Sequence, residues 1–312
     1  METQNKKPNE KEEKLKATRT VYCYYFPEIR EIIDQAVKEY PHKVFLSSIN
    51  PGLDNFHIPI IEKFVQYNKK LVFGLNNFPF KYFTEGSRQG IFHLLVELKV
   101  KEPNILFYTL KGEYEGYKEY AVRLGIKVQE ISEDEDFSKL ESGVFFISNP
   151  SGRDGNIIPN QLIEGICKYH RVIYDIAYLG LTKEHNFDVS YPNIIAVLAS
   201  MSKSFGMYYY RAGFAFTKEP METLIANKWF KNIFSLIITE KVLDNIKPQQ
   251  FYEKYHLLQE KIIFNLNEKY NLSLKASDVF LLANTKSYIE PFMRDKFCRL
   301  CLTPYFLEEE GL

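Results

Sequence analysis

The chain has 312 residues, a length that predicts one large domain with a smaller companion rather than a single core. Lysine plus arginine and aspartate plus glutamate number 40 each, so the formal net charge is zero and nothing favours nucleic acid or a membrane surface as a partner. No apolar run is long enough to span a bilayer, and no hydrophobic signal region begins the chain. Cys298 and Cys301 form a lone C-x-x-C, but no second pair or histidine cluster accompanies it. We therefore expect a cytoplasmic protein with reduced thiols and no metal.

The N-terminal part of the chain predicts a tail followed by helices. Residues 1–18 are dense in lysine, glutamate and asparagine and nearly devoid of apolar side chains, so we expect them to be disordered. A short strand is predicted at 21–26. Apolar residues at helical spacing predict amphipathic helices at 27–40 and 58–67, and the apolar run between them leads to a turn at 50–52.

From about residue 44 to residue 216, predicted strands alternate with predicted helices. The helices follow Gly86 and cover 114–124 and 160–170, and the strands cover 104–109, 127–131, 144–147, 171–174 and 194–199. This alternation is typical of an α/β fold with a mostly parallel sheet sandwiched by helices. Three successive strands would deliver Asn149, Asp175 and Lys203 at their carboxyl ends, where open α/β sheets keep their chemistry.

Beyond residue 216 the pattern changes. One long helix is predicted at 249–270, and strands are predicted at 279–282 and 297–302, which together indicate a small, trimmed α+β domain. We therefore divide the chain into a disordered tail at 1–18, a large domain at 44–247, and a small domain built from 19–43 and 248–312.

The segment from Ser200 to Gly213 carries the most specific chemistry in the sequence. Lys203 lies just past a predicted buried strand, among small hydroxyl residues, and a lysine in such a place can form an imine with an aldehyde. Arg211 follows eight residues later, beside hydroxyl and glycine positions suited to an anion. An aldehyde that also carries a phosphate is pyridoxal phosphate (PLP). Taken alone, the pair would more often be a surface lysine and arginine after a core strand.

Further motifs in the chain support this interpretation. In order, they are the turn Gly86-Ser87-Arg88, then Asn149-Pro-Ser-Gly152, then Asp175-Ile-Ala-Tyr178, then Ser200-Met-Ser-Lys203 with Arg211. Together they resemble the PLP-dependent aminotransferases of fold type I, class I/II, over residues 82–299. The resemblance implies PLP as the cofactor and the large domain of fold type I.

The resemblance also implies roles at the cofactor ring. Lys203 would hold the cofactor as an imine and later move a proton, and Asp175 would face the pyridine nitrogen. Tyr178 and Asn149 would donate hydrogen bonds to the ring's phenolate oxygen. As residues alone, Asp175 could instead cap a helix, Tyr178 could belong to the core, and Asn149 could be a turn residue before proline.

Contacts to the cofactor phosphate are implied in the same way. Ser200 and Arg211 would bind it together with backbone N–H groups of Ser87 and Arg88. Arg88 stands where the family usually has a smaller or neutral side chain. Tyr114 resembles the aromatic residue that stacks on the ring, although a tyrosine at a helix start could equally pack against the core.

For the substrate, Arg299 resembles the arginine that grips an α-carboxylate, and Asn149 would share in that contact. Arg294 is a nearby competitor. As a residue alone, Arg299 could instead form an ion pair with an acid or lie in water on an edge strand.

These residues predict a transaminase that moves the amino group of an α-amino acid to a 2-oxo acid. A decarboxylase or β-eliminating lyase acting on an amino acid is the alternative, and a degenerate, non-catalytic binding or scaffold relative is the hypothesis from another class. The family implies a homodimer with the active site near the subunit interface. The sequence does not locate the N-terminal segment that normally closes over the substrate, nor the tyrosine usually lent by the second subunit.

Overall fold

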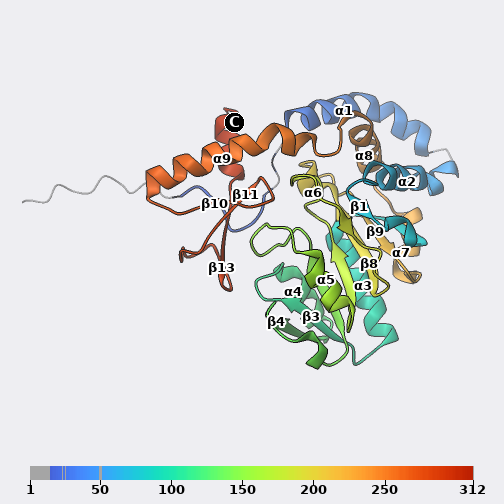
Figure 1. The fold of residues 1–312 in the computed structure, drawn as a ribbon. Coiled ribbons are helices and arrows are strands. Elements are labelled where there is room, and N and C mark those ends of the chain that lie inside the picture. The colour runs from blue at the N-terminus through green and yellow to red at the C-terminus, as the bar shows by residue number, and fades with distance from the viewer. Residues whose placement is uncertain (1–14, 23, 25, 49–50, 312) are drawn as a thin grey trace, which may run out of the picture.

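A seven-stranded sheet forms the centre of the fold (Figure 1). The computed structural model describes residues 15–22, 24, 26–48 and 51–311, without the side chains of 41–48 and 51–52. The sheet has the order β2-β9-β8-β6-β5-β3-β4. Its strands are β2 (Phe80–Thr84), β3 (Leu106–Leu110), β4 (Lys127–Ile131), β5 (Val144–Ser148), β6 (Arg171–Asp175), β8 (Ile194–Ser200) and β9 (Gly213–Thr217).

Pairing within this sheet is mostly parallel, as predicted. The neighbours β8, β6, β5, β3 and β4 all pair in parallel, and β9 runs antiparallel to β8 and to β2. Alternate residues of β5 enter two separate hydrophobic clusters: Phe145 and Ile147 belong to one, Val144 and Phe146 to the other. The strand is therefore buried on both faces, as its continuous apolar run indicated.

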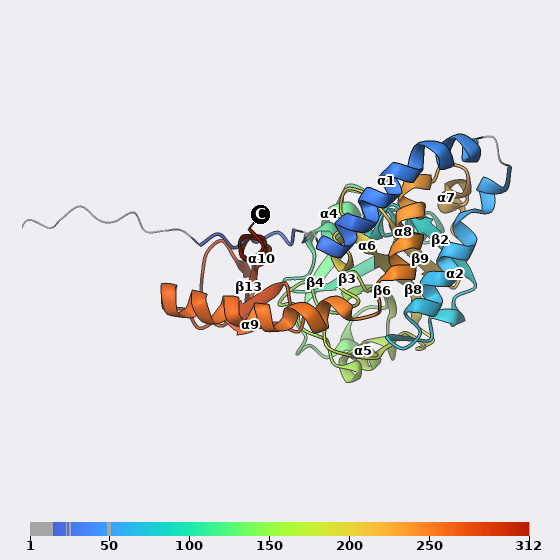
Figure 2. The same cartoon turned by 90° about the horizontal axis from the view of Figure 1, so that it is seen from above.

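Helices cover both faces of the sheet, which confirms the predicted sandwich. The cluster that contains Phe146 includes residues of α3 (Ser87–Lys101), α4 (Glu115–Arg123) and α7 (Glu222–Ile225). The cluster that contains Phe145 includes residues of α1 (Pro27–Ser48), α2 (His57–Tyr67), α5 (Asn160–Cys167) and α8 (Ile233–Asn245). The helix α1 lies along α8 (Figure 2).

The C-terminal region lies to one side of the large sheet (Figure 1). The helix α9 (Gln250–Tyr270) confirms the long helix predicted there, and α10 (Thr303–Glu309) is the last helix of the described chain. Between them is a four-stranded antiparallel sheet in the order β10-β11-β13-β12. Its strands are β10 (Lys275–Ala276), β11 (Leu282–Thr285), β12 (Met293–Arg294) and β13 (Phe297–Cys301).

The strand predicted at 279–282 is wrong, because a turn occupies most of that run and β11 starts only at Leu282. Val279 donates its backbone N–H to Gly155 at 3.0 Å, and Phe280 donates its own to Leu181 at 3.1 Å. The run is apolar because it docks on loops that follow β5 and β6, so burial here does not come from strand pairing.

The N-terminal predictions need two corrections. Residues 21, 22, 24 and 26 are not in a strand, whereas the predicted helix at 27–40 is present and continues through Ser48. Most of the predicted tail lies outside the described residues. At its end, however, Ala17 is buried and Thr18 forms an antiparallel bridge with Cys301, so the prediction of disorder reached too far. The division into a large and a small domain stays a prediction.

Shorter elements connect the main ones. They are the 3₁₀ turns η1 (Pro51–Asn55), η2 (Leu75–Asn77), η3 (Phe137–Lys139) and η4 (Ala226–Lys228), the parallel pair β1 (Val72–Phe73) and β7 (Phe187–Asp188), and the single turn α6 (Met201–Ser204). Among the described residues, no helix combines the length and apolarity needed to cross a bilayer.

Gly213 makes the close approach of β2, β9 and β8 possible, which gives a test of the fold. A Cβ at this position would lie 2.5 Å from the Gly86 Cα and 2.6 Å from the Ala199 carbonyl oxygen, both backbone atoms. We expect Gly213→Ala to lower the free energy of unfolding by about 2 kcal/mol or more, because the backbone atoms that the added methyl group would contact cannot move away without disturbing the strands. Denaturant unfolding followed by circular dichroism measures the change.

Gly165 supplies the matched control, since it lies within α5 and a Cβ there would meet nothing within 4 Å. Gly165→Ala is expected to stabilise by about 0.5–1 kcal/mol through helix propensity. Equal stability of the Gly213→Ala protein and the wild type would contradict the tight packing of these three strands.

Candidate active site

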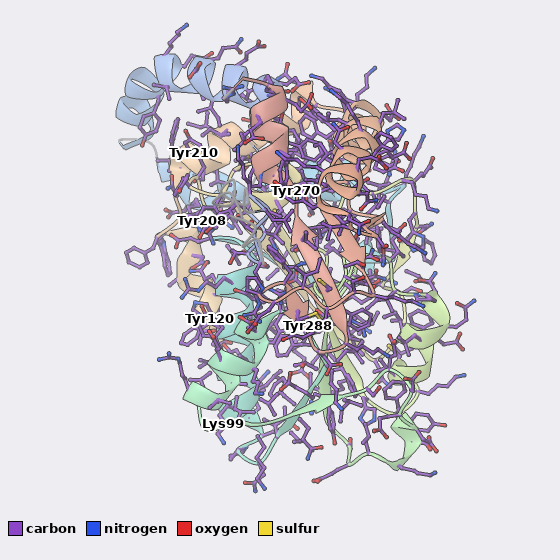
Figure 3. All side chains as sticks on the ribbon, turned by 90° about the vertical axis from the view of Figure 1, so that its left-hand side faces the viewer. Lys99, Tyr120, Tyr208, Tyr210, Tyr270 and Tyr288 are labelled. Atoms are coloured by element: carbon purple, nitrogen blue, oxygen red, sulfur yellow. The ribbon has the colours of Figure 1, made fainter. Side chains whose placement is uncertain are left out.

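A cavity of about 480 Å³ opens where the carboxyl ends of β6 and β8 meet the N-terminus of α3 and the C-terminal sheet. All but one of the predicted site residues line it: Ser87, Arg88, Tyr114, Asp175, Tyr178, Ser200, Lys203, Arg211 and Arg299. Figure 3 labels Tyr120 and Tyr208, two further residues of its wall. The predicted strand ends and the distant Arg299 are therefore brought together by the fold.

Lys203 lies on α6, the single helical turn that follows β8 directly. Ser200 caps this turn, because its side-chain oxygen accepts a hydrogen bond of 3.2 Å from the Ser202 N–H. The Lys203 Nζ donates to the Tyr178 hydroxyl at 3.1 Å and lies 4.2 Å from the centre of that ring. Among the residues that the structure describes, Lys203 forms no salt bridge, so its amine is held by a neutral group.

Asp175 ends β6 and is only 3% exposed. One carboxylate oxygen accepts from the Tyr117 hydroxyl at 2.9 Å, and the other accepts from the Ala177 backbone N–H at 3.0 Å. Burial raises the pKa of this carboxyl to about 6, although the Tyr117 hydrogen bond and the charge of Lys203 act in the opposite direction. No helix begins at Asp175, so the cap interpretation does not hold.

The N-terminus of α3 has a geometry that suits anion binding. Gly86, the residue before the helix, has φ +84° and ψ 171°, and no side chain caps the first turn. A Cβ on Gly86 would lie 2.9 Å from Nη2 of Arg211 and 3.5 Å from the Ser200 Oγ. The glycine therefore keeps open a space that free backbone N–H groups, a guanidinium and a hydroxyl share, and such a space suits a phosphate.

Arg211 is held in that place by backbone and hydroxyl oxygens. Its Nη2 donates to the Glu85 carbonyl at 2.8 Å, and its Nη1 donates to the Tyr208 carbonyl at 3.1 Å and to the Ser202 hydroxyl at 3.2 Å. It forms no salt bridge among the described residues, so its charge is available to a ligand. Its own backbone has φ +44°, a left-handed conformation that costs a non-glycine residue energy.

Arg299 is 2% exposed on β13, a strand with neighbours on both sides. Its guanidinium donates to the carbonyl oxygens of Gly152 and, at 2.6 Å, of Arg19, while its buried Nε has no partner. Neither alternative interpretation holds, because Arg299 lies on an inner strand and forms no ion pair with any described acid. A buried cation with only neutral partners is expensive unless an anion meets it.

Asn149 is the predicted site residue that the fold does not bring to the cavity. Its amide nitrogen donates to the Ile158 carbonyl at 3.1 Å and to the Tyr174 hydroxyl at 2.7 Å, and its oxygen accepts from the Ile158 N–H at 2.9 Å. The fully buried side chain is thus used in holding the loop after β5. Ser148 and Gly152, on either side of it in the chain, line the cavity instead.

Three tyrosines in and just before α4 also line the cavity: Tyr114, Tyr117 and Tyr120. Tyr114 is 41% exposed, so it does not pack in the core, and its ring meets Tyr117 edge-on with 5.3 Å between centroids. Burial of its hydroxyl end raises the pKa of Tyr114. The Arg88 side chain contacts Tyr120 both through a hydrogen bond to its hydroxyl and above its ring, at 5.3 Å from the centroid. Sequence reasoning missed Tyr117, although its spacing of three residues from Tyr114 on a helix was a usable signal.

The structure also brings part of the N-terminal segment to the cavity, which the sequence had not located. Thr20 and Val21 line it, and Arg19 forms an ion pair with Glu115 of α4 at 2.7 Å. The contact of Arg299 with the Arg19 carbonyl anchors the same segment from the other side. No local pattern in residues 19–21 indicates this position, because it depends on contacts with residues far along the chain.

Comparisons with known proteins agree with this geometry. The family model for aminotransferase class I and II matches residues 83–265. A search of curated proteins finds no match.

Solved structures match over most of both chains, at identities that show the fold alone. They include a PLP-bound protein from Clostridium difficile 630 (TM-score 0.68, 12% identity, 92% of this chain and 87% of that one). An aminotransferase from Staphylococcus aureus gives a TM-score of 0.67 at 13% identity over 94% and 91%. L-threonine-O-3-phosphate decarboxylase from Porphyromonas gingivalis gives 0.63 at 14% identity over 95% and 97%.

Burial of the Asp175 carboxylate is expected to lower the free energy of unfolding of the cofactor-free protein in a pH-dependent way. Its pKa is about 6 in the folded chain against 3.8 as the reference value. Between those two values the unfolded chain has already lost the proton that the folded chain keeps, so stability falls as pH rises and stays reduced above pH 6. The difference corresponds to about 3 kcal/mol.

We therefore expect Asp175→Asn to stabilise the cofactor-free protein at about pH 8, with a gain that shrinks towards zero as the pH falls to about 4. Denaturant unfolding at several pH values measures it. Asp34→Asn, on an exposed position of α1, is the control and should leave the profile unchanged. A stability gain independent of pH would mean that the Asp175 charge is not its source.

Proposed function

This chain belongs to the aminotransferase class I and II family, whose members are PLP-dependent enzymes, and from that premise we propose that it transfers the amino group of an α-amino acid to a 2-oxo acid. The observation that carries the proposal is that one cavity contains an amine, a buried carboxylate with no salt bridge to any described residue, and an uncapped helix start beside an arginine. Lys203, Asp175 and Gly86 with Arg211 supply these three features. Each of them suits a different part of PLP.

When bound, PLP supplies an aldehyde for a lysine amine and a ring that accepts the electrons released when a bond to the substrate Cα breaks. The Lys203 Nζ would hold the aldehyde carbon, and once freed it would carry a proton to and from the substrate Cα. Tyr178, whose hydroxyl is 3.1 Å from that nitrogen, would keep the amine in position. The short α6 turn, capped by Ser200, fixes where the lysine starts.

Asp175 would provide the negative charge opposite the ring nitrogen and so favour the protonated ring. The carboxylate is already desolvated and already oriented by Tyr117 and by the Ala177 N–H, so little reorganisation is needed when a cation arrives. A cationic partner would also relieve the burial that raises the pKa of this carboxyl.

The phosphate would lie between the N-terminus of α3, Ser200 and Arg211, in the space that Gly86 leaves open. The Ser87 and Arg88 backbone N–H groups begin that helix. The Arg88 side chain is directed to Tyr120, so its backbone is the part that suits the phosphate.

Arg299 would bind the substrate α-carboxylate. Its terminal nitrogens share two backbone carbonyls, and these contacts fix the plane of the guanidinium without neutralising it. The same residues would also serve a decarboxylase or a β-eliminating lyase, which product analysis separates from a transaminase. The homodimer stays a prediction from the family resemblance, and the cytoplasmic location stays a prediction from the sequence.

Lys203→Ala tests the cofactor proposal. We expect the purified wild type to be yellow after incubation with PLP, and borohydride to fix the cofactor on the peptide that contains Lys203, as read by mass spectrometry. Lys203→Ala should lose both the visible absorbance and amino transfer. Lys183→Ala, which removes an exposed lysine, should keep them.

A colourless wild type that takes up no PLP would overturn the proposed function. A yellow protein that releases carbon dioxide or ammonia from amino acids, without forming a 2-oxo acid and a new amino acid, would assign the lyase chemistry instead.

Arg299→Lys tests the carboxylate contact. The change keeps the charge but loses the two-pronged geometry, so amino-acid binding should weaken by roughly 2–3 kcal/mol, about 30- to 150-fold. The PLP absorbance should stay unchanged, and amines that lack the carboxylate should be poor substrates for both proteins. An equal loss with amines and amino acids would place the carboxylate contact elsewhere.

A further inference from the structure

A second arginine shares the cavity with Arg299. Arg294 lies on β12, where it pairs with Phe297 of β13, and Arg299 follows two residues further along that strand. Side chains two residues apart on a strand point to the same face, and diagonal neighbours across an antiparallel pair are close. Both arginines therefore project from one face of the β12–β13 hairpin, and both line the cavity that contains Lys203.

Arg294 has no partner for its charge among the residues that the structure describes. It forms no salt bridge there, and its Nε is buried without a hydrogen bond. Glu115, whose charge acts on it, is already engaged in the ion pair with Arg19 at 2.7 Å. The neighbouring Asp295 is exposed and lies in no ion pair with it. Burial and then the charge of Arg299 lower the pKa of Arg294 to about 10, which still leaves it cationic at neutral pH.

The hairpin packs closely on the rest of the fold at Arg294. The backbone carbonyl of Arg294 approaches Gly112 so closely that a Cβ on this glycine would lie 2.7 Å from the oxygen. Gly112 belongs to the turn between β3 and α4, so the hairpin packs against the part of the fold that carries Tyr114 and Tyr117. The backbone that carries this unpaired cation is thus packed against the rest of the cavity wall.

Two adjacent cations without carboxylate partners need more than one negative charge from a ligand. An α-carboxylate brings one charge, which the Arg299 fork would take. Arg294 would then remain a partly buried, unmatched cation in the presence of a neutral amino acid, and such groups are costly. A substrate with an anionic side chain would satisfy it.

We propose that the substrate is an amino acid with a second anionic group, a carboxylate or a phosphate on its side chain, and that Arg294 binds this group while Arg299 binds the α-carboxylate. This inference rests on the proposed function. It names a substrate class and a specificity-determining residue.

The test compares non-reacting probes on the PLP-loaded wild type by isothermal titration calorimetry. Succinate and 3-phosphonopropionate carry two anionic groups, and butyrate, with a similar chain length, carries one. We expect at least one of the dianionic probes to bind about tenfold or more tightly than butyrate, since a charge-assisted hydrogen bond contributes that much. The better of the two identifies the carboxylate or the phosphate as the second group.

Arg294→Gln should abolish this advantage and leave butyrate binding unchanged. The matched control is Lys296→Gln on the same hairpin, because Lys296 pairs with Glu133 at 3.0 Å outside the cavity, and its loss should alter neither probe. Thermal unfolding gives a further readout. Without ligand, Arg294→Gln should melt at or above the wild-type temperature, and a dianionic probe should stabilise the wild type but not the variant.

Equal binding of all three probes to the wild type overturns the inference. This result needs no variant, so the inference can be tested even if Arg294→Gln does not fold. Arg294→Gln that weakens butyrate as much as succinate also overturns it, because the role of Arg294 would then be structural. If the protein binds PLP but binds the three probes equally, only this inference is rejected. If the protein takes up no PLP, the proposed function and this inference are both rejected.

Discussion

The parallel pairing of β5, β6 and β8 is the constraint on which the site depends. Ser148 is the register partner of Asp175, and Asp175 is the partner of Leu198, two residues before Ser200. Parallel strands that share a register end at the same edge of a sheet. The hydroxyl, the carboxylate and the lysine-bearing turn are therefore close together because of backbone hydrogen bonding, before any side-chain contact is made.

At that edge Asp175, Arg211 and Arg299 have neutral hydrogen-bond partners and form no salt bridge among the described residues. Asp175 has a tyrosine and a backbone N–H as partners, Arg211 has carbonyls and a hydroxyl, and Arg299 has two carbonyls. Neutral partners orient these groups without neutralising them. Buried charges without charged partners lower stability, and groups that are already oriented and desolvated reorganise little when an ion of opposite charge binds.

Segments far apart in the sequence complete the cavity. The hairpin that carries Arg294 and Arg299 packs on the turn at Gly112, and Arg299 reaches both Gly152 and the N-terminal Arg19. The ion pair between Arg19 and Glu115 then links the N-terminal segment to α4. The C-terminal sheet thus forms a second wall of the cavity that contains Lys203.

The sequence by itself determined the parallel sheet and its covering helices, because hydrophobic period is a local property. Strand-end motifs and the family resemblance also identified nine of the residues that line the cavity. Asp175 ends one strand and Lys203 follows another, and the burial of both strands can be read from composition alone. Only the tertiary structure decided the partners of these groups. The Asn149 side chain bonds to Ile158 and Tyr174. The Tyr117 hydroxyl bonds to Asp175. Val279 and Phe280 contact loops instead of pairing in a sheet, and Thr20 and Val21 line the cavity. The absence of a partner for Arg294 among the described residues is of the same kind, because a missing contact is a property of the whole packed chain and no local pattern records it.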